Sequence, residues 1–191
     1  KIQIEGGGEL DVSWTGRNTW EARLPIKPGS ETFTIEALNF SGQRVGSKTI
    51  TIRNTSSTVP AEKGNLVISK IHFQPAAPSS SETAAGFSDA SDFEYVELKN
   101  TGTQEINLAN ARFTSGINHS LPGHTLAPEE QAILARNRSA LLKRFPELGS
   151  KLLSGEYGQE DSNSFSDRGE KVTLSTLDGA VIHSLSYKNP T

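Results

Sequence analysis

The first 53 residues alternate between apolar and polar positions in several short runs. Two of these runs, ELDVSW and TWEARLPI, each place their apolar side chains on one face. Those side chains are Leu10, Val12 and Trp14 in the first run, and Trp20, Ala22, Leu24 and Ile26 in the second. A period of two predicts half-buried antiparallel strands. We therefore expect both tryptophans on the core face.

This block is short for a β-sandwich, which needs about 100 residues. It opens directly on the strand pattern KIQIEG, and it continues as a strand, a Pro-Gly turn, a second strand and an Asn-x-x-Gly turn. That order resembles the second half of immunoglobulin-like modules in bacterial surface proteins. We interpret residues 1–53 as a partial β-sandwich. Because open strand edges associate, we expect these strands to pack on the second domain or on a neighbouring molecule.

Residues 54–65, NTSSTVPAEKGN, have the composition of a linker. A second domain is predicted for 66–191. Its strand-like runs are LVISKIHF (66–73), EYVELKN (94–100), EINLANARF (105–113), HTLAPEEQAILARN (124–137), EKVTLST (170–176) and AVIHSLSY (180–187). One short helix is predicted near 139–146, with Ser139 as its N-cap and Pro146 ending it.

A polar segment at 74–92, QPAAPSSSETAAGFSDASD, interrupts the strands. A loop this long in a compact domain is uncommon. It ends on Asp89, Asp92 and Glu94, and calcium prefers such carboxylate oxygens on a loop. These three residues are the candidate metal ligands, with calcium as the candidate ion. The spacing matches no EF-hand, and the alternative is a solvated acidic loop.

The amino-acid composition and net charge exclude several kinds of site and partner. The chain has 191 residues, a net charge of −3 and no cysteine, which excludes disulfides and thiolate zinc sites. Its densest basic run, RNRSALLKR (136–144), is too small for a phosphate-binding stripe, so nucleic-acid binding is not expected. No apolar run is long enough to span a membrane. The chain begins at Lys1 and lacks methionine, which we interpret as a piece cut from a longer protein.

No catalytic constellation emerges from the sequence. The histidines at 72, 119, 124 and 183 lack metal-ligand spacing, and no G-x-S-x-G nucleophile motif is present. We therefore predict that the chain is not an enzyme and has no assigned cofactor beyond the candidate calcium.

From residue 66 onward the chain resembles a bacterial lamin tail domain. The matching stretches are LVISKIHFQP, EYVELKNTGTQEINLANARFTS, LPGHTLAPEEQAILARN and SDRGEKVTLSTLDGAVIHSLSYKN. The order and spacing of these stretches agree with the family pattern over about 125 residues. Three positions depart from the family pattern: Lys70 replaces an acid, Lys99 an aromatic residue and Ala111 a tryptophan.

The resemblance implies an all-β, immunoglobulin-like β-sandwich without catalysis of its own. It implies a non-catalytic binding or spacer module of an exported, multi-domain bacterial protein. The module would be extracellular or at the cell surface, with a protein or cell-surface partner. The alternative is a carbohydrate-binding module that uses exposed aromatic side chains. The candidates are Trp14, Trp20, Tyr95, Tyr157 and Tyr187.

Overall fold

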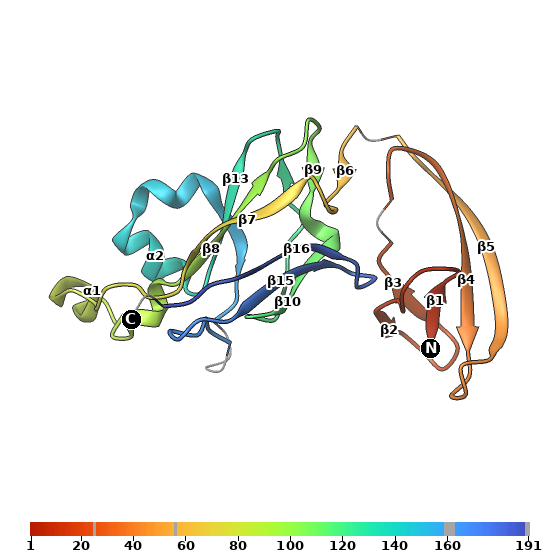
Figure 1. Ribbon diagram of the computed structural model, residues 1–191, viewed down its shortest axis with the longest axis horizontal. Helices are drawn as coiled ribbons and strands as arrows, with labels where there is room; N and C mark the ends of the chain where they lie inside the picture. Colours follow the sequence, from red (N-terminus) through yellow and green to blue (C-terminus); the bar gives the residue numbers. More distant parts are fainter. Residues whose placement is uncertain (25, 56, 159–162, 190–191) are drawn as a thin grey trace.

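The computed structural model describes residues 1–24, 26–55, 57–158 and 163–189. Figure 1 shows strands throughout, with the N-terminal strands at one end of the long axis and the helices α1 and α2 at the other. The described part of the chain is an all-β protein with short helices, and the predicted fold class is confirmed.

The N-terminal unit consists of a three-stranded antiparallel sheet and a separate hairpin. The sheet has the order β1-β4-β5 and contains β1 (Ile2–Ile4), β4 (Gly29–Leu38) and β5 (Arg44–Asn54). The hairpin pairs β2 (Val12–Trp14) with β3 (Trp20–Ala22). The expectation that both tryptophans face a core is wrong for Trp14, which is 63% exposed. Leu10, at the other end of that face, is buried at 4% exposure.

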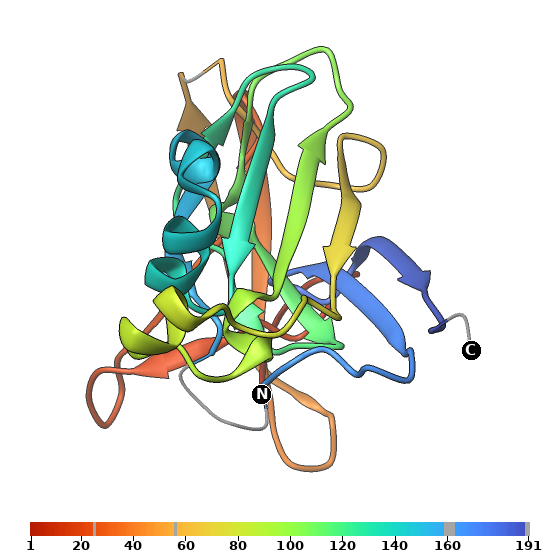
Figure 2. The ribbon, with the colours of Figure 1, turned by 90° about the vertical axis from the view of Figure 1, so that its left-hand side faces the viewer.

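Two four-stranded sheets form the sandwich. The first has the order β14-β13-β8-β7 and the second β11-β10-β15-β16, while β12, β9 and β6 form a smaller sheet. The strands of the first sheet are β7 (Leu66–His72), β8 (Tyr95–Asn100), β13 (Gln131–Ala135) and β14 (Leu152–Glu156). Those of the second are β10 (Ala111–Ser115), β11 (His119–Ser120), β15 (Lys171–Thr176) and β16 (Val181–Ser186). The smaller sheet contains β6 (Val59–Pro60), β9 (Ile106–Asn107) and β12 (Thr125–Leu126). In Figure 2, β7, β8 and β13 lie side by side, with the helices beside them.

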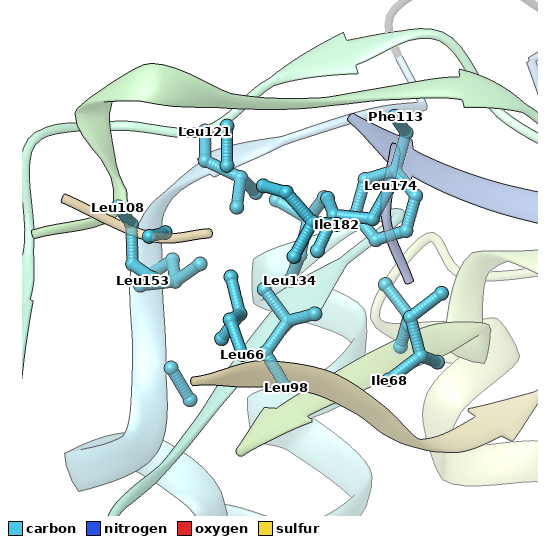
Figure 3. Packing of buried hydrophobic residues seen from close by; sticks show 14 of the residues in the cluster. Leu66, Ile68, Leu98, Leu108, Phe113, Leu121, Leu134, Leu153, Leu174 and Ile182 are labelled. Atoms are coloured by element: carbon cyan, nitrogen blue, oxygen red, sulfur yellow. The ribbon is translucent and has the colours of Figure 1, made fainter. Parts of the chain in front are cut away.

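The main core lies between the two larger sheets. Figure 3 shows Leu66, Ile68 and Leu98 of the first sheet facing Leu174 and Ile182 of the second. These side chains are at most 5% exposed, and alternation along β8 places Val96 beside Leu98 on this inner face. Ala111 is also fully buried in this core, so the residue that replaces the family tryptophan still contributes to packing.

Part of the predicted linker belongs to the sandwich. Val59 and Pro60 pair in parallel with Ile106 and Asn107, and Ala61 is fully buried in the core. Asn110 fixes this segment: its amide nitrogen donates to the Ala61 carbonyl at 2.8 Å, and its oxygen accepts from the Ala61 N–H at 3.1 Å. The polar composition of 54–65 concealed this pairing, because a two-residue strand has no periodicity.

The predicted helix is present as α2 (Arg138–Arg144), followed by the 3-10 helix η3 (Pro146–Lys151). Its N-cap is Asn137 and not Ser139, because the Asn137 side chain accepts from the Ala140 N–H at 3.0 Å. Pro146 ends α2, as expected, and begins η3. The helix packs Leu141 against Tyr95 and Ile133 on the outer face of the first sheet.

The N-terminal unit contacts the sandwich through loop residues, whereas its edge strand β5 pairs only with β4 among the described residues. Lys27 forms an ion pair with Glu62 at 2.7 Å, and Asp11 lies 3.8 Å from the Arg112 guanidinium. Gly8 approaches the carbonyl oxygen of Asp178 so closely that a Cβ at this position would overlap it. A side chain at residue 8 would therefore push the two units apart.

Candidate functional site

The segment 74–92 is ordered by a capping box and a buried ion pair. It contains α1 (Ser80–Ala84), whose N-cap Ser79 accepts from the Glu82 N–H while the Glu82 carboxylate accepts from the Ser79 N–H at 2.7 Å. This helix was not predicted, although the pattern Ser-x-x-Glu at 79–82 is the signal of a capping box. The segment is therefore a short helix within a loop.

Arg144 of α2 holds this segment against the sandwich. Its Nε and one terminal nitrogen donate to the two oxygens of Glu82 at 2.8 and 3.0 Å, and the other terminal nitrogen donates to the Ala76 carbonyl at 2.9 Å. The guanidinium carbon also lies 3.3 Å from the centre of the Phe93 ring. The hydrogen bonds to Glu82 lower the pKa of its carboxyl group to about 2, and those from Arg144 have the largest effect. Lysine could not replace Arg144 here, because the paired donors on Glu82 and the contact with the Phe93 ring both use the planar guanidinium group.

The structure gives the three candidate calcium ligands separate partners. Asp89 caps the 3-10 helix η1 (Ala90–Phe93) by accepting from the Ser91 N–H at 2.9 Å, and this bond lowers its pKa. Asp92 accepts from the Asn137 amide at 3.3 Å. Glu94 is 2% exposed and accepts from the Phe165 N–H at 3.1 Å.

Among the described residues, no three Asp, Glu or His side chains are placed to hold a metal ion together. The arrangement of Asp89, Asp92 and Glu94 therefore gives no support to the calcium site, which stays a prediction. The histidines are also separate: His72 stacks on Tyr95, and His183 accepts from the Ile68 N–H at 3.3 Å.

Glu94 is the most unusual titratable group of the described sandwich. It precedes β8 and carries its carboxyl group into the interior, where the Tyr157 hydroxyl lies 3.4 Å away. Burial raises the pKa of Glu94 to about 7, although the Phe165 N–H, the Arg136 charge and the Tyr157 hydroxyl act in the opposite direction. The same burial raises the pKa of Tyr157 well above its usual value. Burial makes the charged form costly and so favours the protonated acid.

Four cavities of the described structure are lined by residues other than Glu94 and Tyr157. One of them, of about 420 Å³, lies between the two units. Apolar side chains from both units line it, among them Leu24, Ile52, Val59 and Ala109, and its charged residue is Arg53. Among the described residues that line this cavity, no acid, base and nucleophile lie close enough together to act as a catalytic set.

The aromatic residues proposed for carbohydrate binding are mostly committed to packing. Tyr95 and Tyr157 are 6% and 1% exposed. Tyr187 packs on Phe73 with ring centres 4.3 Å apart and donates to the Ser166 carbonyl at 2.8 Å. Trp14 is the candidate that remains largely exposed, opposite Trp20 in the β2–β3 hairpin.

The paired sheets and their apolar interior define an immunoglobulin-like β-sandwich, a non-catalytic fold type. The lamin tail domain model matches residues 59–189. The chain belongs to the lamin tail domain family. The match begins at the first residue of β6, where the sandwich itself begins.

A comparison with curated proteins gives no significant match. Within the described residues, no helix has the length and apolar character needed to cross a membrane.

Proposed function

We propose that the chain is a non-catalytic binding or spacer module of an exported, multi-domain bacterial protein. It would act outside the cell or at its surface, with a protein or a surface component as its partner. The lamin tail domain family supports a binding or structural role. The bacterial and exported setting rests on the sequence resemblance.

One observation carries the proposal: three buried polar side chains of the sandwich are hydrogen-bonded within the chain. Glu82 is occupied by Arg144, and Glu94 accepts from the Phe165 N–H inside the sandwich. Asn110 uses both ends of its amide on Ala61. Side chains that fix loops and strands in this way maintain a shape, which is what a spacer or a binding surface requires.

The contacts between the two units support a spacer role more directly. The Lys27–Glu62 pair, the Asp11–Arg112 approach and the tight packing of Gly8 hold the N-terminal unit beside the sandwich. A module that keeps other domains apart needs a defined angle between its parts. Gly8 and Asp11 lie between β1 and β2, and Lys27 lies between β3 and β4, so two connections of the N-terminal unit contact the sandwich.

Enzyme assays test the non-catalytic part. Incubation of the chain with nuclease, glycosidase, esterase and phosphatase substrates should give no turnover. Turnover that disappears when one residue of the chain is substituted would overturn the proposal. Turnover that survives every substitution would point to a contaminating enzyme.

Small-angle X-ray scattering of the purified chain tests the spacer part. We expect one compact arrangement for the native chain and a wider distribution of sizes for Gly8→Ala, because the new methyl group would overlap the Asp178 carbonyl. Gly123→Ala is the matched control, since a Cβ at Gly123 meets no atom within 4 Å. A native chain that already samples many arrangements would contradict the spacer role.

Carbohydrate binding is the second candidate, and the exposure of Trp14 favours it. A tryptophan with 63% exposure at a hairpin end can stack on a sugar ring. Binding on a glycan array that is lost in Trp14→Ala would support this function. A blank array would remove it.

A further inference from the structure

Strand β5 has an open edge that runs the full length of the N-terminal sheet. It has 11 residues and pairs only with β4 in the described part of the chain. Residues 44–49 and most of the remaining strand are exposed or half-buried. A long strand with one unpaired side is a template for another strand.

The register shows which backbone groups face this open edge. Thr34 of β4 accepts from the Glu5 N–H at 2.8 Å, so its backbone is directed toward the β1 side of the sheet. Backbone groups alternate along an antiparallel strand, and Phe33 and Ile35 are therefore directed toward β5. Their partners Ile50 and Lys48 face back toward β4. Thr49, between them, carries its N–H and carbonyl on the open side.

The side chains beside this edge carry one sign of charge. Strand β5 contains Arg44, Lys48 and Arg53 and no acidic residue. Arg44 already pairs with Glu36 at 3.0 Å, whereas no ion pair is formed by Lys48 or Arg53 within the described residues. A second copy of the chain would bring the same cations together across an antiparallel pairing. An acidic strand would neutralise them.

The sheet also offers apolar surface next to the edge. Ile50 and Ile52 are half-buried and lie on the same face as Phe33 across the β4–β5 pairing. An added strand would extend this face and cover more of the two isoleucines. Such strand addition combines backbone hydrogen bonds with side-chain specificity.

We propose that the open edge of β5 accepts an additional β-strand from an extended segment that carries acidic residues opposite Lys48 and Arg53. This inference rests on the proposed binding role and names its partner chemistry. Lysine on an edge strand also discourages pairing between copies. The same residues thus disfavour self-association and select an acidic partner.

The probe is a synthetic peptide of threonine and valine with two glutamates five residues apart, labelled for fluorescence anisotropy. These glutamates lie on opposite faces of the added strand, as Lys48 and Arg53 do on β5. A peptide with lysine in place of glutamate is its matched control. We expect binding of the acidic peptide at low salt, weaker binding at high salt and no binding of the basic peptide. Salt dependence is expected because exposed charges are screened.

Two variants locate the binding to the edge. Thr49→Pro removes a donor on the open side, and proline is tolerated on edge strands where the N–H faces solvent. Lys48→Glu reverses the charge. Loss of one hydrogen bond or one charge contact corresponds to roughly tenfold weaker binding. Thr49→Val, which keeps the N–H, and Lys171→Glu, on the doubly paired strand β15, should bind like the native chain.

Circular dichroism checks that each variant keeps its strand content. Equal binding of both peptides, or binding unaffected by Thr49→Pro and Lys48→Glu in folded variants, would overturn the inference. A dimer in sedimentation velocity that disappears with Thr49→Pro would assign the edge to a second copy and would also overturn it. None of these results changes the enzyme and scattering tests, so failure here is distinguishable from failure of the proposed function.

Discussion

The buried carboxyl of Glu94 should make the stability of the sandwich depend on pH. Its pKa is raised from 4.5 to about 7, chiefly by burial. In the unfolded chain the group loses its proton near its ordinary pKa, whereas in the folded chain it keeps the proton to higher pH. Between these two values the unfolded state binds fewer protons. The free energy of unfolding therefore falls as the pH rises from about 4.5 to about 7, and it levels off above that range.

The size of this effect follows from the two pKa values. A rise from 4.5 to about 7 corresponds to about 3 kcal/mol as an upper bound. Local relaxation and water entry around the ionised carboxylate reduce the cost of ionisation below this bound, so we expect about 1 to 2 kcal/mol. Glu94→Gln should remove this loss, because an amide does not titrate and its oxygen can still accept from the Phe165 N–H.

The assay is urea denaturation of the native chain and of Glu94→Gln at about pH 5 and about pH 8. Both tryptophans lie in the N-terminal unit and all three tyrosines in the sandwich, so near-ultraviolet circular dichroism separates the two transitions. Relative to the native chain, the variant should gain about 1 to 2 kcal/mol between the lower and the higher pH. Tyr157→Phe, which removes one donor to Glu94, should lose more stability at the higher pH. An equal pH dependence in the native chain and Glu94→Gln would refute the reasoning.

Three further substitutions or additions test the remaining contacts. Arg144→Lys keeps the charge but loses the fork on Glu82, so hydrogen exchange in 76–93 should accelerate, whereas Lys143→Ala, exposed on the same helix, should change nothing. Asn110→Ala removes both bonds to Ala61 and should cost about 1 to 3 kcal/mol in urea denaturation. Calcium at a hundredfold excess over its dissociation constant would add about 2.7 kcal/mol if Asp89, Asp92 and Glu94 bound it. Because the three acids have separate partners, we expect an unchanged melting curve, whereas a higher melting temperature would support the calcium site.

The sequence predicted the sandwich well because its strands are long enough to show alternation. Val96 and Leu98 face the core while Tyr95 faces the other side, as the period of two requires. Helix α2 was also visible, since Leu141 and Phe145 lie four residues apart on one face. Its N-cap was misplaced by two residues because Asn137 and Ser139 are both good caps, and only the hydrogen bond to Ala140 distinguishes them.

The candidate site was harder to predict because its partners are far apart in the sequence. Glu82 and Arg144 are 62 residues apart, and Glu94 and Phe165 are 71 residues apart. Acidic composition alone suggested calcium for Asp89, Asp92 and Glu94. It could not show that backbone N–H groups and an amide donate to these carboxylates in the folded chain. Exposure of Trp14 was missed for a similar reason, because alternation defines a face but not whether another layer covers it.

The two ends of the molecule are held by contacts of different strength, and this difference bears on how a spacer would move. The fork of Arg144 on Glu82 is largely shielded from solvent, so segment 74–92 should move with the sandwich. The contacts at the other end are exposed, and an exposed ion pair contributes about 0 to 1 kcal/mol and is screened by salt. Arg112 illustrates the looser fit: its guanidinium is 3.8 Å from Asp11, and its buried Nε has no hydrogen-bond partner in the described structure. A small rotation of the N-terminal unit could shorten that distance without disturbing either sheet. The junction between the units is therefore weaker than the sandwich itself, and the close approach of Gly8 to Asp178 adds to the two ion contacts that hold it.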